Sequence, residues 1–306
     1  MRFRIRHVSS YRYERPVRLG PHVLRLQPHG AGVTLDDFRL SLYPAPLSLE
    51  PGVDEAGNPT HTATFEGDAA EFRIGIQAEG ETSEAPELPP APGTLPPFYG
   101  DEIQDLWRYR VVSAAEAEAS VNLELRADDP SERTDDEKDF EMDVAAFARD
   151  VAVDAAGDAG VFLRALSMAL YLRVRNVSRL TGAPLPPEVT LSEGQGSCRD
   201  FAVLFVACCR LQGLAARFVS GYIPAPAGEP QHMHAWAEAH VPGIGWTAWD
   251  ATQGGPAGAS HIPVAAAAEP SDAAPVTGSY NGAWASEMSV ELKVETGEGE
   301  LLVISR

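Results

Sequence analysis

Residues 194–213, which read GQGSCRDFAVLFVACCRLQG, decide how the second half of this chain folds. Apolar residues recur at helical spacing between residues 201 and 211 and also occupy the flanking positions. The pattern therefore predicts a helix that is apolar on nearly every side and runs through the core. Ser197 followed by Asp200 has the S-x-x-D spacing of a capping box, and Gly213 is placed to end the helix.

This helix would carry Cys198 in its first turn. A helix N-terminus has backbone N–H groups without helical partners and the positive end of the macrodipole. Both features lower the pKa of a thiol and favour the nucleophilic thiolate. Cys208 and Cys209 fall inside the apolar run, so we expect them to be buried core residues with raised pKa values. The simpler alternative for Cys198 is a small residue packed at a helix start, and residues further along the chain decide between the two.

Composition and charge narrow the class of protein. The chain has 306 residues, 44% of them hydrophobic and 22% charged, which is an ordinary globular balance. A formal net charge of −20 argues against nucleic acid or an anionic membrane surface as a partner. Three cysteines do not make a disulfide framework, residues 1–10 lack an apolar signal core, and no apolar run approaches the ~20 residues that span a bilayer. We expect a cytoplasmic protein without a cofactor.

The pattern along the chain predicts an α+β protein of two domains. Residues 1–85 contain several short alternating strands separated by turns, which indicates an antiparallel, β-sandwich-like N-terminal domain. Six prolines between residues 86 and 97 mark a stiff linker, and we assign 86–135 to that linker and an ambiguous segment. Residues 136–306 would form the second domain, including strands near the C-terminus.

The second domain also supplies the partners that a nucleophilic Cys198 needs. A thiolate requires a base for its proton and a third group to orient that base. Along residues 234–239 His234 and Trp236 alternate with alanines, as in a strand, and a return strand ends at Asp250. The intervening turn would bring Asp250 beside His234. Trp236 shares the face of His234, so it could either pack or line a substrate cleft.

Here the residues resemble a known family. The order GQGSCRDFAVLF, SGYI, HAWAEAHVPGIGW and WDATQG resembles the transglutaminase-like superfamily, in particular its bacterial cysteine-protease-like members. GPHVLRLQP and EAGNPTHTATF resemble the β-rich region that precedes this core in bacteria. The resemblance implies a papain/transglutaminase-like core, with Cys198 as nucleophile, His234 as base and Asp250 as the orienting carboxylate. It also implies an oxyanion hole, for which the Cys198 backbone N–H and, more weakly, Gln195 are the candidates.

Three functional hypotheses follow from these residues. The first is an enzyme that transfers an acyl group from a peptide or glutamine amide through a Cys198 thioester, with hydrolysis favoured and transamidation left open. The second is a catalytically silent core that binds or assembles with other proteins. The third is a zinc-dependent hydrolase in which His232 and His234 form an H-x-H pair. The expected partner is a peptide or protein substrate, and the oligomeric state is left open.

Overall fold

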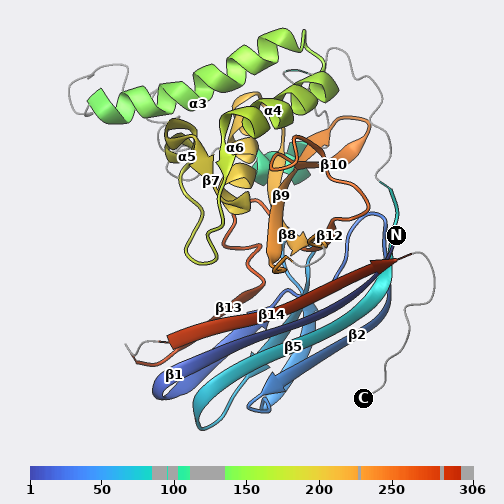
Figure 1. The fold of residues 1–306 in the computed structure, drawn as a ribbon, viewed down its shortest axis with the longest axis vertical. Helices are drawn as coiled ribbons and strands as arrows, with labels where there is room; N and C mark the ends of the chain where they lie inside the picture. The colour runs from blue at the N-terminus through green and yellow to red at the C-terminus, as the bar shows by residue number, and fades with distance from the viewer. Residues whose placement is uncertain (85–94, 96–102, 111–134, 227–228, 283–285, 298–306) are drawn as a thin grey trace.

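The computed structural model describes residues 1–84, 95, 103–110, 135–226, 229–282 and 286–297. It is an α+β structure in which a broad antiparallel sheet at one end meets a smaller sheet that carries the helices (Figure 1). The predicted fold class is confirmed. Of the helices described, none has the length and apolar character needed to cross a membrane.

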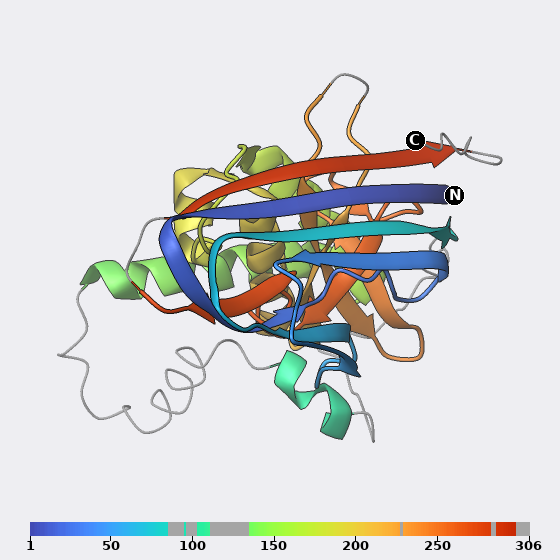
Figure 2. The ribbon, with the colours of Figure 1, turned by 90° about the horizontal axis from the view of Figure 1, so that it is seen from below.

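The large sheet is built around one long strand, β1 (Arg2–Leu24). Along its first half β1 pairs with β5 on one side and β14 on the other, and β2 continues beyond β5 (Figure 2). Its second half pairs with β4 and β13, and β3 continues beyond β4. The partners are β2 (Val33–Tyr43), β3 (Ser48–Val53), β4 (Pro59–Thr64), β5 (Asp68–Thr82), β13 (Val276–Tyr280) and β14 (Ser286–Gly297).

The placement of the C-terminal strands corrects the expected domain division. We expected 136–306 to keep its own C-terminal strands, but β14 pairs with β1 from Arg2 to Tyr13, and β13 also pairs with β1. Without β14, this stretch of β1 would be an open sheet edge with unpaired backbone groups. The first domain is therefore assembled from both ends of the chain.

The segment 86–135 lies mostly outside the described residues. Its described part contains α1 (Ile103–Leu106) and η2 (Trp107–Tyr109), and Leu106 and Tyr109 pack against Ala215 of the second domain.

The smaller sheet is five-stranded and antiparallel, in the order β11-β10-β9-β8-β12. Its strands are β8 (Ala216–Tyr222), β9 (Met233–Val241), β10 (Gly245–Asp250), β11 (Gly255–Pro256) and β12 (Ile262–Ala267). Four helices accompany it: α3 (Asp135–Asp154), α4 (Ala159–Arg173), α5 (Pro187–Glu193) and α6 (Cys198–Leu211). A short parallel pair, β6 (Arg175–Asn176) with β7 (Gln195–Gly196), leads into α6.

Helix α6 lies where the sequence places it. It begins at Cys198 with the predicted capping box between Ser197 and Asp200, and Gly213 just beyond its end has φ 78°. The helix is buried nearly all round and lies along β9. The strand presents alanines to the helical layer, among them Ala237 and Ala239, and such small side chains let a helix approach a sheet closely.

The two sheets share a buried interface. Phe3 and Ile5 of β1 belong to the same apolar cluster as Tyr222 of β8 and Ile262 of β12. Polar contacts cross the boundary as well: His7 Nδ1 lies 2.8 Å from the Tyr222 hydroxyl. Desolvation at this site lowers the pKa of His7 to about 4, so the imidazole is neutral at ordinary pH.

A turn of the N-terminal domain also inserts into the second domain. Asn58, in the turn between β3 and β4, accepts a hydrogen bond from the Ala266 N–H (2.8 Å) and donates one to its carbonyl (3.0 Å). Asn58 is 1% exposed. The N-terminal domain thus pairs with the backbone of β12 and helps to hold that strand in place.

Candidate active site

The start of α6 is held by a buried carboxylate. The Asp200 side chain is fully buried and accepts hydrogen bonds from the Ser197 N–H (2.7 Å) and hydroxyl (2.8 Å). It also accepts hydrogen bonds from the Leu185 N–H (2.6 Å) and the Arg179 guanidinium (2.5 Å). Asp200 is therefore more than a cap, because it anchors the loop before α5 to the first turn of α6. Sequence reasoning found the cap but not the two loop partners.

The loop that precedes Cys198 has little room for side chains. A Cβ on Gly196 would lie 2.9 Å from the Asp200 Cβ and 3.0 Å from Thr190 Cγ2. Gly194, which ends α5, has φ 60°. Arg199 closes the other side by donating to the carbonyl oxygens of Gly182 (2.7 Å) and Arg179 (2.5 Å). Cys198 thus follows a closely packed turn that is held by hydrogen bonds on the helix side.

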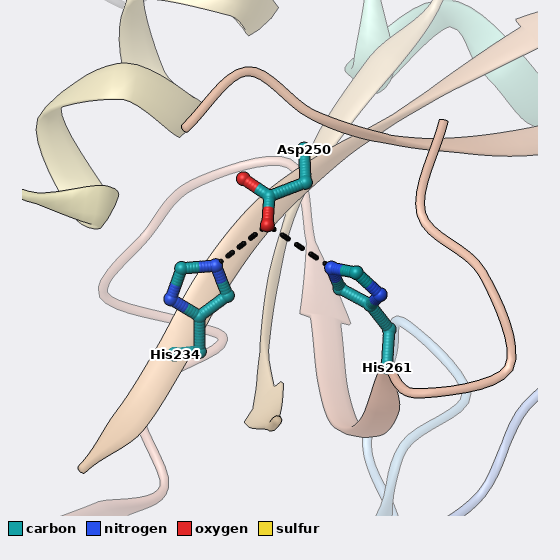
Figure 3. Close-up of side chains that lie close together, drawn as sticks. All are labelled: His234, Asp250 and His261. Atoms are coloured by element: carbon teal, nitrogen blue, oxygen red, sulfur yellow. Dashed lines mark hydrogen bonds and ion pairs between the residues drawn. The ribbon is translucent and has the colours of Figure 1, made fainter. Parts of the chain in front are cut away.

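His234 and Asp250 meet at the end of two neighbouring strands. Strands β9 and β10 are antiparallel, and Asp250 is the last residue of β10. The His234 Nε2 lies 2.8 Å from Asp250 Oδ2 (Figure 3). The other carboxylate oxygen, Oδ1, accepts hydrogen bonds from the Thr252 N–H (2.9 Å) and hydroxyl (2.7 Å). The carboxylate is 1% exposed and is satisfied on both oxygens.

Cys198 meets this pair from the helix side. Its thiol shares a hydrogen bond with the His234 side chain and accepts one from the Ala235 N–H. Because Asp250 occupies Nε2 of the imidazole, Nδ1 is the nitrogen left to face the sulfur. The structure therefore brings Cys198, His234 and Asp250 into one hydrogen-bonded chain.

The protonation of these groups follows from their contacts. Burial alone would raise the pKa of Cys198, but the hydrogen bond and charge of His234, the Ala235 N–H and Arg199 lower it overall. Burial would likewise lower the pKa of His234, yet its bonds to Asp250 and Cys198 raise it to about 9. Burial would raise the pKa of Asp250, and its bonds to His234 and His261 instead hold it well below the ordinary value. These contacts therefore shift each group toward its charged form, the thiolate of Cys198, the imidazolium of His234 and the carboxylate of Asp250.

A second histidine joins the cluster, and sequence reasoning missed it. His261 Nε2 lies 3.0 Å from Asp250 Oδ2, and the residue is 7% exposed (Figure 3). It directly precedes β12. A signal was available, because the apolar run 262–267 directly after His261 indicates a buried strand that would carry the histidine inward.

The remaining candidates take other positions. Gln195 accepts a hydrogen bond from Arg175 through Oε1 (2.6 Å), which leaves its side-chain NH₂ as a donor. Trp236 is 2% exposed and packs edge-on against the His261 ring, with centroids 5.1 Å apart. Of the two alternatives for Trp236, its burial favours packing, because its ring belongs to a buried apolar cluster.

His232, the residue proposed to pair with His234 on a metal, is exposed. Within the described part of the chain, the group spaced to hold a metal ion is instead His234, Asp250 and His261, whose ligand atoms lie within 4.8 Å of one another. All three are tied together by hydrogen bonds on Asp250 Oδ2. The H-x-H pair therefore does not form the site that the third hypothesis requires.

We expect the three cysteines to differ sharply in reactivity. Brief iodoacetamide treatment of the native protein at about pH 6 should alkylate Cys198 alone, because His234 and Arg199 favour its thiolate. Cys208 and Cys209 are fully buried, and desolvation raises the pKa of both thiols. Peptide mapping by mass spectrometry measures the selectivity, and a denatured sample labelled on all three is the control. Earlier labelling of Cys208 or Cys209 would contradict this assignment.

Comparisons with known proteins agree with this architecture. Residues 146–251 match the transglutaminase-like superfamily, and residues 3–81 match the bacterial transglutaminase-like N-terminal region. The crystal structure of a "putative cysteine protease" from Cytophaga hutchinsonii has a TM-score of 0.68 at 20% identity, over 98% of this chain and 92% of that one. This likeness shows a shared fold.

Two mycobacterial relatives are uncharacterised. A protein of Mycobacterium tuberculosis is 30% identical over 152 residues, which are 46% of this chain and 48% of the relative. A protein of Mycobacterium leprae is 31% identical over 110 residues, which are 34% and 39% of the two chains. The matched regions thus span less than half the length of these curated relatives.

Proposed function

Because this chain belongs to the transglutaminase-like superfamily, with the bacterial N-terminal region ahead of the core, we propose that it catalyses cysteine-dependent acyl transfer from an amide. The donor would be a peptide bond or a glutamine side chain, and the intermediate a thioester on Cys198. The hydrogen-bonded chain from Cys198 through His234 to Asp250 is the observation that carries the proposal.

The first half of the reaction uses the thiolate and the imidazolium. The Cys198 sulfur attacks the carbonyl carbon of the amide, and a C–S bond forms as the carbonyl oxygen takes up negative charge. That charge develops at the N-terminus of α6, where the Cys198 backbone N–H has no helical partner and can donate. The side-chain NH₂ of Gln195 is a second candidate donor. The C–N bond then breaks as His234 gives its proton to the departing amine.

The second half restores the enzyme. His234, now neutral, takes a proton from water, and the resulting hydroxide adds to the thioester carbonyl. The C–S bond breaks, which releases a carboxylic acid and returns the thiolate beside the imidazolium. An amine in place of water would give transamidation by the same steps. We favour hydrolysis, because water needs no acceptor site of its own.

The other two hypotheses have less support. A silent binding module does not require a buried carboxylate, imidazole and thiol in one chain, since burial of such groups is costly without a role. A zinc hydrolase that uses His232 and His234 lacks a matching geometry, because His232 is exposed.

A covalent intermediate tests the proposal directly. We expect a chromogenic ester such as p-nitrophenyl acetate to acylate Cys198, because a better leaving group makes formation of the thioester faster than its hydrolysis. Intact mass after rapid acid quench should show one acetyl group, and peptide mapping should place it on Cys198. His234→Ala should slow acylation by about 100-fold or more, as loss of a general base or ion-pair partner does.

Matched controls separate thiol from metal chemistry. His232→Ala removes a histidine two residues away and should acylate at the wild-type rate, and exhaustive chelation should also leave the rate unchanged. Acylation that stops on chelation and returns with zinc would overturn the thioester mechanism.

A further inference from the structure

Asp250 Oδ2 is shared between two imidazole rings. His234 Nε2 lies 2.8 Å from this oxygen, and His261 Nε2 lies 3.0 Å from it (Figure 3). The acyl-transfer steps above employ only His234. His261 therefore has a direct bond to the site and no role in it so far.

The His261 ring is held firmly where it is. Its side chain is 4% exposed, its ring packs edge-on against Trp236 at 5.1 Å, and its Nδ1 lies 3.3 Å from the Ser260 hydroxyl. Its Nε2 faces Oδ2 from a different side than the His234 ring does (Figure 3). The second bond to Asp250 is thus a fixed part of the site.

The positions of the protons follow from the acceptor. The ionised carboxylate can only accept hydrogen bonds, so each Nε2 that lies against Oδ2 must carry a proton. For His234 this leaves Nδ1 to exchange a proton with Cys198. For His261 it makes the ring a donor to the same oxygen that holds His234.

We propose that His261 is a positioning residue that acts on His234 through Asp250. By donating to Oδ2, it takes up part of the carboxylate charge and limits how strongly Asp250 holds the proton-bearing form of His234. The inference rests on the proposed function, in which His234 must both hold a proton beside the thiolate and give that proton to the leaving amine.

If the His261 donor is removed, His234 should hold its proton more tightly. With one hydrogen bond fewer, Oδ2 would attract the His234 imidazolium more strongly, because a carboxylate with fewer donors is a better acceptor. Thr252 would still hold the carboxylate through Oδ1. The groups that face the Cys198–His234 pair are Asp250 on the far side of the imidazole and Arg199 on the helix side, and neither changes. Thiolate would form at lower pH, while release of the amine would slow.

A pair of nearly isosteric variants tests this. His261→Met fills the site without an N–H donor, whereas His261→Gln keeps a donor at the reach of Nε2. For His261→Met we expect the acidic midpoint of Cys198 alkylation by iodoacetamide to fall by about half a pH unit, and turnover of an amide substrate to fall about tenfold. His261→Gln should stay close to wild type in both measurements. A loss of structure would slow labelling and turnover together, so the opposite signs identify the positioning role.

His232→Gln, at an exposed histidine, should keep the wild-type profile. An unchanged labelling midpoint in His261→Met, or equal shifts in the Met and Gln variants, would overturn the proposal. Labelling needs no amide turnover, so if the wild type cleaved no amide, the acyl-transfer function would fail while this test remained decisive.

If His261→Met does not fold, the wild type provides the answer. NMR spectra of protein labelled with ¹⁵N-histidine should show a proton on His261 Nε2. The N–H coupling of this group should change when Cys198 is alkylated. A His261 ring protonated on Nδ1 alone would rule out the donor role.

Discussion

Cys198→Ala should abolish acyl transfer and leave the fold intact. The sulfur is the protein atom that bonds to the substrate carbon in the proposed steps, so its loss should lower kcat/KM by about 10⁴-fold or more. The stability effect should be small, because the residue is half-buried at the start of a helix whose cap is formed by Ser197 and Asp200. We expect the thermal midpoint to move by less than about 3 °C.

Cys208→Ala is the matched control on the same helix. Cys208 is completely buried in the core, so truncation should cost about 1–2 kcal/mol of unfolding free energy and leave kcat/KM near wild type. Cys198→Ala should therefore lose activity and keep its stability, whereas Cys208→Ala should lose stability and keep its activity. Turnover by Cys198→Ala at the wild-type rate would eliminate the thioester mechanism.

Asp250→Asn should be the second most damaging change. An asparagine can turn its NH₂ toward His234 Nε2, which would favour a proton on Nδ1 and remove the acceptor that faces Cys198. We expect kcat/KM to fall by about 10³–10⁴-fold with a smaller change in KM. Asp272→Asn, an exposed carboxylate, is the control that should behave as wild type.

The same variant changes the pH dependence in a defined direction. Asp250 contributes to raising the pKa of His234 to about 9, so the wild type should lose activity as pH rises through about 9, when the imidazolium that protonates the amine is depleted. In Asp250→Asn this alkaline limb should move to lower pH. A pH profile of kcat for both proteins measures the shift, and an unmoved limb would mean that Asp250 does not set the protonation of His234.

The free energy of unfolding should also depend on pH, through the shifted pKa values of His234 and Asp250. The raised pKa of His234 contributes stability that is fully present below the unfolded value near 6.5 and is lost as pH rises through about 9. The depressed pKa of Asp250 contributes stability above its ordinary value of 3.8, and this is lost on acidification. The difference in unfolding free energy between wild type and Asp250→Asn should thus be largest between about pH 4 and 6.5. Urea unfolding at several pH values measures it.

The helix α6 and the place of Cys198 at its start could be predicted because their determinants are local. Capping by Ser197 and Asp200, the apolar periodicity of α6 and the glycine after its end all act within a few residues. The order of Cys198, His234 and Asp250 along the chain was equally visible. Their strand setting followed from the alternation of His234 and Trp236 with alanines, since successive side chains of a strand point to opposite faces.

What only the tertiary structure decided was contact between distant segments. β14 completes the sheet of the N-terminal domain because β1 has an edge that must be paired. The alternation of polar and apolar residues in β14 predicts a strand but does not specify which strand it pairs with. His261 reaches Asp250 because β12 pairs with β8, a register set by packing across the sheet. A hydrogen bond depends on position to within a few tenths of an ångström, whereas sequence periodicity specifies only the face on which a side chain lies.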